Sequence, residues 1–213
     1  MKKVNLIIGV IIVFILSYNV FAQTGGAAVD EIRTGTLSTS TVGNDTAQGG
    51  NVTMMNLSTT QTTTRWQGYY GNVSGSLSLG YGSDVFYDFS SSSISSVFVS
   101  QNETFDFTQL ETAQAVDIDA VWGYASGVDR AIDIFTGSSS ILGVSAPSVE
   151  LEPTGSNFNS TILDDGNNQT KSGFAFGVNV QEPAVPCFDG SNCEYELMVP
   201  SDGQETYYFF LTI

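Results

Sequence analysis

The chain has 213 residues, of which 22 are acidic, six are Lys or Arg and none is His. Two of the six cations, Lys2 and Lys3, precede Ala22, so the part that follows carries a formal charge of −18 at neutral pH. Its four scattered cations cannot form the basic patch that nucleic acid or an anionic membrane surface requires, which excludes both as direct partners. The absence of histidine excludes Ser-His-Asp and Cys-His catalysis.

The first 22 residues are organised like a secretory signal peptide. A basic start is followed by an apolar stretch over residues 6–16 and by small residues at positions 20–22 that resemble a signal-peptidase site. A membrane anchor fits less well, because a spanning helix needs roughly 20 apolar residues. We therefore expect cleavage after Ala22 and a mature chain that is secreted or held at the cell surface.

Seven of the 11 Asn residues after Ala22 begin an Asn-x-Ser/Thr sequon, more than chance gives in a chain rich in Ser and Thr. Such sequons mark exposed loops of secreted proteins. A polar surface that never meets a glycosyltransferase would show the same pattern, so both interpretations stay open. The candidate glycosylation sites are Asn44, Asn51, Asn56, Asn72, Asn102, Asn159 and Asn168.

Cys187 and Cys193 are the only cysteines. In an oxidising compartment, a pair this close predicts a disulfide that closes the turn over residues 188–192. Without histidine, two cysteines cannot form a usual structural zinc site.

The residues after the signal peptide are enough for one domain with a substantial core. Residues 23–50 are rich in Gly, Ser and Thr, and we expect them to form a flexible leader to a β domain over residues 51–213. In that domain, alternating apolar residues predict a strand that begins at Val52 and Met54. They also predict later strands over residues 65–79, 84–89 (the second strand of a hairpin), 94–100, 141–144, 148–151, 158–163, 174–180, 195–199 and 206–213.

The pattern becomes helical in the middle of the chain. Ala113, Val116, Ala120 and Val121 recur at helical spacing and predict a short amphipathic helix over residues 109–122. A helical turn is expected to follow over residues 128–135.

Two details of the late strands define the fold further. Gly173, Ala175 and Gly177 alternate with large residues, which predicts close packing on one face. The last strand is apolar on both faces, so it is either central or an edge covered by a neighbouring subunit. Together the elements predict an antiparallel β-sandwich, jelly-roll or immunoglobulin-like, with one short helical insertion.

Candidate ligand sites are few. Asp164, Asp165 and Asn167 surround Gly166 with hard oxygen donors, so calcium is the cation we would expect there, although Asp and Asn also favour turns for backbone reasons. No other cofactor is expected.

Trp66 and Tyr70 fall on the strand parity opposite to Tyr69 and Val73. They could therefore be exposed and stack a sugar ring or a partner. A bulge at the neighbouring glycines would instead return Trp66 to the core, and core packing is the interpretation we favour.

Any enzyme of this composition would have to use carboxylates. Asp117 with Asp119, or Asp129 with Asp133, could act as the acid and base of a glycosidase, which requires separations of about 5 to 10 Å. Acidic residues are so frequent that such a pair arises by accident, and a solvated helix end explains Asp129 and Asp133 equally well. We do not expect an enzyme, and a glycoside hydrolase remains a remote alternative.

Four segments carry a resemblance to other proteins: residues 65–75, 121–123, 193–200 and 206–210. In these segments the chain resembles a set of uncharacterised secreted archaeal surface proteins. The resemblance implies an extracellular, N-glycosylated, β-rich surface protein and carries over no site.

We therefore expect a structural or interaction protein that binds protein partners or copies of itself, such as a subunit of the cell envelope or of a filament. An extended segment, either residues 23–50 or the last strand, could join subunits by β-strand addition. A carbohydrate- or calcium-binding module is the alternative.

Overall fold

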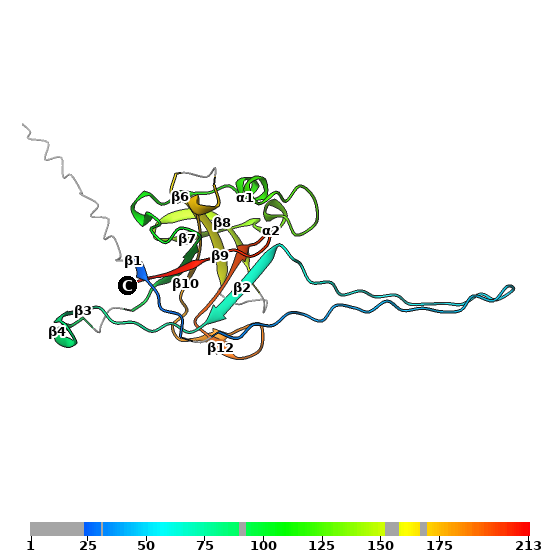
Figure 1. Cartoon of the computed structure of the whole chain (residues 1–213), viewed down its shortest axis with the longest axis horizontal. Helices are drawn as coiled ribbons and strands as arrows, with labels where there is room; N and C mark the ends of the chain where they lie inside the picture. Colours follow the sequence, from blue (N-terminus) through cyan, green and yellow to red (C-terminus); the bar gives the residue numbers. More distant parts are fainter. Residues whose placement is uncertain (1–23, 31, 90–92, 152–157, 167–169) are drawn as a thin grey trace, which may run out of the picture.

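The computed structural model describes residues 24–30, 32–89, 93–151, 158–166 and 170–213 (Figure 1). The expected signal peptide and Asn167 and Asn168 lie outside these residues. The described chain is mainly β with antiparallel pairing, which confirms the predicted fold class. It contains two helices, α1 (Ala115–Trp122) and α2 (Ala131–Ile134), at one end of the domain.

The main sheet has eight strands in the described part of the chain. Its strand order is β1 (Thr24–Gly26), β14 (Tyr208–Thr212), β5 (Ser96–Ser100), β10 (Phe174–Asn179), β9 (Asn159–Asp164), β8 (Val144–Glu150) and β7 (Gly137–Ile141), with β6 (Glu111–Thr112) beside the end of β9. A ribbon of β2 (Trp66–Gly71) and β13 (Tyr195–Pro200) forms the second layer. The remaining elements are short: β3 (Ser78–Tyr81), β4 (Asp84–Asp88), β11 (Val185–Pro186), β12 (Asn192–Cys193), and the 3-10 turns η1 (Phe107–Gln109) and η2 (Lys171–Gly173).

Both faces of the main sheet are buried. On one face, Val97, Val99, Phe176 and Val178 belong to a core that includes Leu197 and other residues of the ribbon and of the helices. The other face forms a second core. Its buried members are Phe98, Phe105, Ile141, Ala146, Leu163, Ala175 and Phe210. Because both faces are covered, every residue of β5 is buried, and this strand cannot show the alternation of a half-exposed strand.

Strand β14 explains the apolar carboxyl-terminal segment. Phe209 and Leu211 pack against the first core, whereas Tyr208 and Phe210 contact the second. The strand lies between β1 and β5, which confirms the predicted central position.

Several element boundaries differ from the sequence prediction. Val52 and Met54 are in no strand, and residues 27–30 and 32–64 instead run out from the domain and back as an extended arm (Figure 1). The strand predicted over residues 65–79 is divided into β2 and β3. The helix begins at Ala115, because Glu111 and Thr112 pair with β9.

Helix α1 also buries a different face from the predicted one. Ile118, Asp119 and Trp122 are buried, whereas Val116 is 52% exposed. The tryptophan decides this orientation, because its ring packs against Phe174 and Phe176 of β10.

No helix in the described part of the chain is long and apolar enough to cross a membrane.

The small face of β10 lets a neighbouring strand pack closely, as predicted. A Cβ atom added at Gly177 would lie 2.7 Å from Cδ1 and Cε1 of Phe98 and 3.0 Å from Cδ1 of Ile141. The phenyl ring of Phe98 thus occupies the space that any side chain at position 177 would need.

Substitution Gly177→Val should lower the free energy of unfolding by about 1–3 kcal/mol, because the added methyl groups overpack the second core. Gly68→Ala in β2 is the matched control, since nothing lies within 4 Å of its added Cβ. Urea unfolding of both variants measures the difference. Equal stabilities would contradict the close packing of Phe98 on Gly177.

Candidate interaction site

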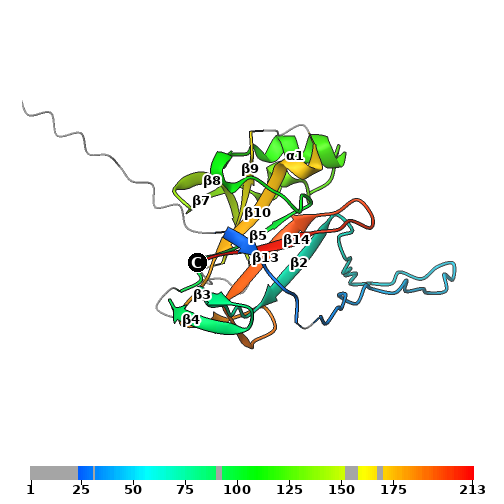
Figure 2. The ribbon, with the colours of Figure 1, turned by 60° about the vertical axis from the view of Figure 1, so that its left-hand side comes forward.

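The arm, described over residues 27–30 and 32–64, consists of two extended legs joined by a turn at Gly49 and Gly50. The legs touch where the Ser40 amide donates to the Thr60 carbonyl at 2.9 Å and where the Thr62 hydroxyl donates to the Leu37 carbonyl at 2.9 Å. The arm projects away from the domain in both ribbon views (Figures 1 and 2).

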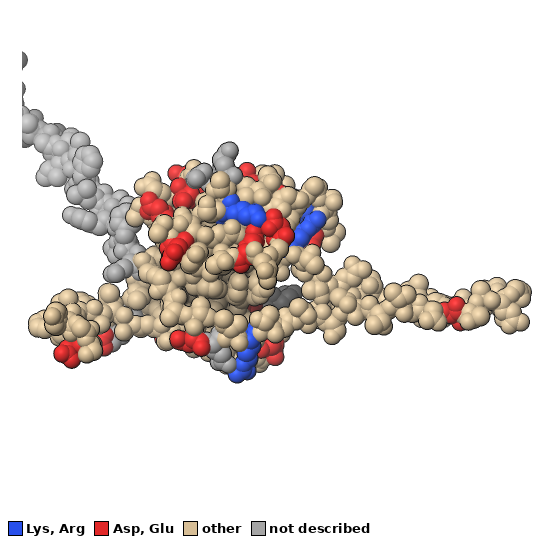
Figure 3. Space-filling model, in the orientation of Figure 1, with Lys and Arg blue, Asp and Glu red and all other residues tan. Residues whose placement is uncertain are grey.

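The arm combines exposed apolar side chains with four charged residues, Asp30, Glu31, Arg33 and Asp45, of which the first three precede residue 34. Its exposed large apolar residues are Val29, Ile32, Leu37, Val42, Val52, Met54, Met55 and Leu57. Val52 is 100% exposed and Met54 is 87% exposed. Between residues 34 and 64 the only charged residue is Asp45. Figure 3 shows the arm in the colour of uncharged residues along almost its whole length, in contrast to the charged domain.

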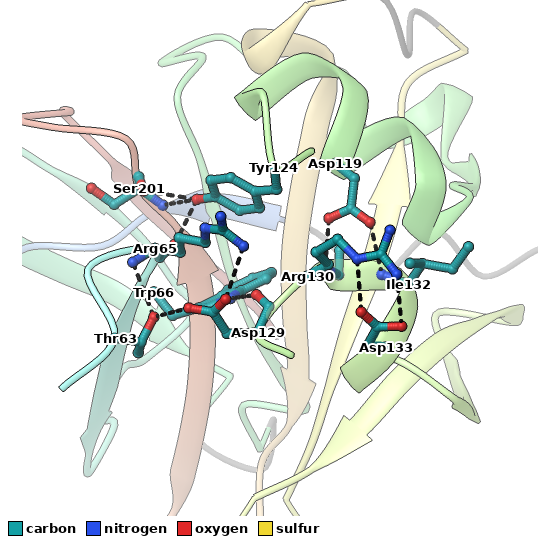
Figure 4. Close-up of polar contacts among 11 residues, drawn as sticks. Thr63, Arg65, Trp66, Asp119, Tyr124, Asp129, Arg130, Ile132, Asp133 and Ser201 are labelled. Atoms are coloured by element: carbon teal, nitrogen blue, oxygen red, sulfur yellow. Dashed lines mark hydrogen bonds and ion pairs between the residues drawn. The ribbon is translucent and has the colours of Figure 1, made fainter. Parts of the chain in front are cut away.

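Asp129 holds the returning leg of the arm against the domain (Figure 4). Its Oδ1 pairs with Nη1 of Arg65 at 2.8 Å, and its Oδ2 accepts from the Thr63 hydroxyl at 2.7 Å. Its backbone carbonyl accepts from Nε1 of Trp66 at 2.7 Å. Three side chains at the junction of the returning leg and β2, those of Thr63, Arg65 and Trp66, are therefore held by one residue from the loop before α2. We call this group the arm root.

Two further residues complete the arm root. The Tyr124 hydroxyl accepts from the Ser201 amide at 2.9 Å and lies 2.6 Å from the Arg65 carbonyl, which links the ends of β2 and β13. Burial of Tyr124 raises its pKa above the ordinary value for tyrosine, so the hydroxyl stays protonated and can donate. Gly127 has a φ of +115°, and a Cβ there would lie 2.8 Å from both Arg65 Nη1 and Asp129 Oδ1. Only glycine leaves room for this ion pair.

Trp66 belongs to the packing of the arm root. Its ring lies 5.5 Å from that of Phe135 and 5.9 Å from that of Tyr124. This confirms the favoured interpretation, but the predicted bulge is not the reason. The register between β2 and β13 is unbroken, and Trp66 is covered because the segment that leads into α2 lies over it.

Tyr70, the other candidate for ligand binding, is 42% exposed. Its ring meets that of Phe188 edge to face, at 88° and 4.8 Å. Its hydroxyl lies 3.2 Å from Asp189 Oδ2. Trp66 and Tyr70 therefore do not form a coplanar platform for a sugar ring.

The predicted disulfide is confirmed between Cys187 and Cys193. The loop that it closes is held to β13 by Glu196, whose Oε1 accepts from the Phe188 amide at 2.8 Å. Glu196 is 3% exposed. Burial raises the pKa of this carboxyl, while the hydrogen bond from Phe188 opposes the rise.

The residues proposed for calcium are only partly described. Asp164 is buried, and its Oδ1 accepts from the Gly166 amide at 2.7 Å, as expected of an Asp that stabilises its own turn. Burial raises the pKa of the Asp164 carboxyl. Asp165 is half-buried, and Asn167 lies outside the described residues.

Three of the four candidate carboxylates for a glycosidase hold local structure. Asp119 accepts from the amides of Ala131 and Ile132 at 2.6 and 3.1 Å and caps α2. Asp129 forms the arm root, and Asp133 pairs with Arg130 at 2.8 Å. Asp117 lies in the first turn of α1.

A shallow depression of about 490 Å³ lies beside the arm root. Trp122 and Tyr124 line it but are 3% and 4% exposed, so they offer edges and not ring faces to a ligand. Asp202, which also lines the depression, forms an ion pair with Lys171 at 2.7 Å.

The described sequons differ in accessibility. Asn44, Asn51, Asn56 and Asn72 are exposed, and the first three lie near the tip of the arm. Asn102 is half-buried, and its Oδ1 accepts from the amide and hydroxyl of Thr104. The sequon of Asn159 lies inside β9.

A second exposed apolar feature is the hairpin of β3 and β4. The turn that was predicted between these strands is confirmed, but all of their nine residues are exposed, so the hairpin is not part of the sandwich. The sequence showed the alternating apolar residues of this hairpin, but it did not show that the hairpin lies apart from the sandwich.

No protein-family model, curated protein or solved structure matches this chain.

Glycan occupancy should follow the accessibility of the sequons. We expect modification at the arm sites Asn44, Asn51 and Asn56 and little or none at Asn159, because its Thr161 is 1% exposed. Glycopeptide mass spectrometry of protein purified from its own host measures the occupancy. Complete glycosylation of Asn159 together with unmodified arm sequons would contradict the expectation that glycosylation follows accessibility.

Glu196→Gln should change how stability depends on pH. The pKa of this carboxyl is raised in the folded chain, so the folded state binds the proton more tightly than the unfolded state does. The contribution of Glu196 to stability therefore falls as the pH rises from about 4.5 through the folded pKa. Glutamine keeps the acceptor for the Phe188 amide without a charge. We therefore expect Glu196→Gln to be more favourable relative to the native protein at pH about 7 than at pH about 4.

Urea unfolding at both pH values tests this expectation, with exposed Glu103→Gln as the control. A stability difference for Glu196→Gln that is the same at both pH values would exclude a raised pKa at this position.

Proposed function

We propose that this chain is a secreted or cell-surface structural protein, and not an enzyme, that assembles through its arm with other protein molecules, including its own copies. A subunit of the cell envelope or of a filament fits this role. The observation that carries the proposal is the exposure of the large apolar side chains of the arm.

Burial of these side chains would strongly favour assembly. Moving one large aliphatic side chain out of water stabilises a contact by about 1.5–3 kcal/mol. The arm has two legs and no second layer, so the isolated molecule leaves Val42, Val52 and Met54 in water. An excess of exposed large apolar side chains on one segment is typical of interaction sites in soluble proteins.

Charge also favours contact through the arm. Each mature copy carries a formal charge of −18, so two domains repel each other at close range. The arm has one charge over residues 34–64 and can approach a second copy with little repulsion. Salt at about 0.15 M reduces the range of the repulsion to about 8 Å.

The arm root gives the arm a fixed point of departure. Thr63, Arg65 and Trp66 are all bound to Asp129, and the guanidinium of Arg65 lies 5.0 Å from the ring centroid of Tyr124. A docking element held in this way loses less conformational freedom on binding than a free tail.

Other features support an extracellular role. The signal-like start, the sequons and the disulfide agree with secretion, and so does the resemblance to secreted archaeal surface proteins. Three sequons lie near the tip of the arm, so glycans there would leave residues 34–43 of the outgoing leg uncovered for protein contact.

Removal of the arm tests the proposal. Because the Leu37 carbonyl and the Thr62 hydroxyl are in contact, residues 38–61 can be replaced by a short Gly-Ser linker without disturbing the arm root. We expect the native mature protein to form large particles in sedimentation velocity, more so at high ionic strength, and the armless variant to sediment as a monomer.

The control for this experiment changes the arm without changing its apolar side chains. Asn44→Gln, Asn51→Gln and Asn56→Gln together remove the arm sequons and should preserve assembly. A native protein that stays monomeric with and without calcium would contradict the proposal.

A further inference from the structure

The β3–β4 hairpin is an unpartnered sheet with an apolar surface. Tyr81 is 91% exposed and Phe86 is 83% exposed, and Leu79, Val85 and Tyr87 are exposed as well. The hairpin pairs with no other described strand, so its backbone edges are open. A two-stranded hairpin alone is marginally stable in water, and a third strand would stabilise it.

The hairpin and the arm project from opposite ends of the molecule. Both ribbon views show the arm leaving on one side and the hairpin on the other (Figures 1 and 2). One molecule therefore presents two different docking elements in opposite directions. Contacts between unlike surfaces of successive copies generate open chains of subunits.

Charge argues against pairing between the β4 edges of two hairpins. Antiparallel pairing of β4 with β4 of a second copy, centred on Phe86, would place Asp84 opposite Asp88 twice. Parallel pairing in register would place each Asp opposite itself. Like charges directly across a sheet are destabilising.

The outgoing leg of the arm meets the requirements of a partner strand. Residues 34–43 contain no charged residue and no sequon, and they include Thr36, Leu37, Thr39, Thr41 and Val42, which are mostly β-branched. Such a segment can add to an open sheet edge through its backbone, with Leu37 and Val42 on opposite faces of the added strand.

We propose that copies of this chain join head to tail, with the arm of one copy added as a strand to the β3–β4 hairpin of the next. This inference rests on the proposed function and names the surface that receives the arm. It makes assembly directional, because each contact uses one arm and one hairpin.

Complementation between two defective copies tests the inference. The first copy is the armless variant, which keeps its hairpin. The second carries Tyr81→Ser and Phe86→Ser and keeps its arm; both side chains are so exposed that their removal leaves no cavity. We expect each variant alone to be monomeric, and an equimolar mixture to form a one-to-one heterodimer and nothing larger.

The controls separate this inference from the proposed function. Val116→Ser, which removes an exposed apolar side chain from α1, should assemble like the native protein, and thermal unfolding should show that every variant is folded. The hairpin variant should weaken self-association about tenfold or more. If it assembles as well as the native protein while the armless variant does not, the head-to-tail contact is wrong but assembly through the arm stands.

Three other outcomes also decide the question. An armless variant that forms dimers alone would show hairpin-to-hairpin pairing and overturn the inference. A native protein that is monomeric under all conditions would overturn both proposals. A native protein that binds only a different protein would leave the arm as a docking element and exclude the second copy as its partner.

Discussion

The arrangement of the molecule depends on Asp129. Its carboxylate binds Thr63 and Arg65, and its backbone carbonyl binds the indole of Trp66. Without these contacts, the returning leg, which has no regular secondary structure, would have no preferred direction where it meets the domain. The ion pair is only partly buried, with side-chain exposures of 27% and 34%, so alone it would contribute little. Its effect comes from being one of several bonds at the same loop, in a space that Gly127 leaves open.

The molecule separates two kinds of surface. The acidic residues lie mainly on the domain, whereas the arm from residue 34 to residue 64 and the chain from residue 66 to residue 83 contain one charge between them. A protein with uniformly distributed charge would repel its own copies everywhere. Here repulsion opposes contact between domains and between two β4 strands, whereas residues 34–64 of the arm can make contact with little repulsion. Charge therefore determines where copies touch, and apolar burial determines how tightly they bind.

The sequence predicted features that depend on neighbouring residues and missed those that depend on distant ones. The alternation in β10, the hairpin turn and the disulfide follow from local spacing, and all three are confirmed. Val52 and Met54 alternate like strand residues, but no partner strand pairs with them, so they remain in the arm. The sequence correctly predicted that Trp66 lies on the strand parity opposite to Tyr69. Its burial could not be predicted, because it depends on a loop some 60 residues later. The arm root was equally hidden, since the sequence offered for Asp129 only a carboxylate pair with Asp133 or a solvated helix end.

The two ends of the arm join different layers of the sandwich. The outgoing leg follows β1, which pairs with β14 in the main sheet, and the returning leg leads into β2, which pairs with β13 in the ribbon. A load applied to the arm is therefore divided between the two sheets. Strand β1 is the weaker attachment, because it has three residues and two of them are glycines without side-chain contacts. The returning leg, held by Asp129 and the register of β2, must carry most of the load, so the stronger anchor lies at the end of the arm that enters the ribbon.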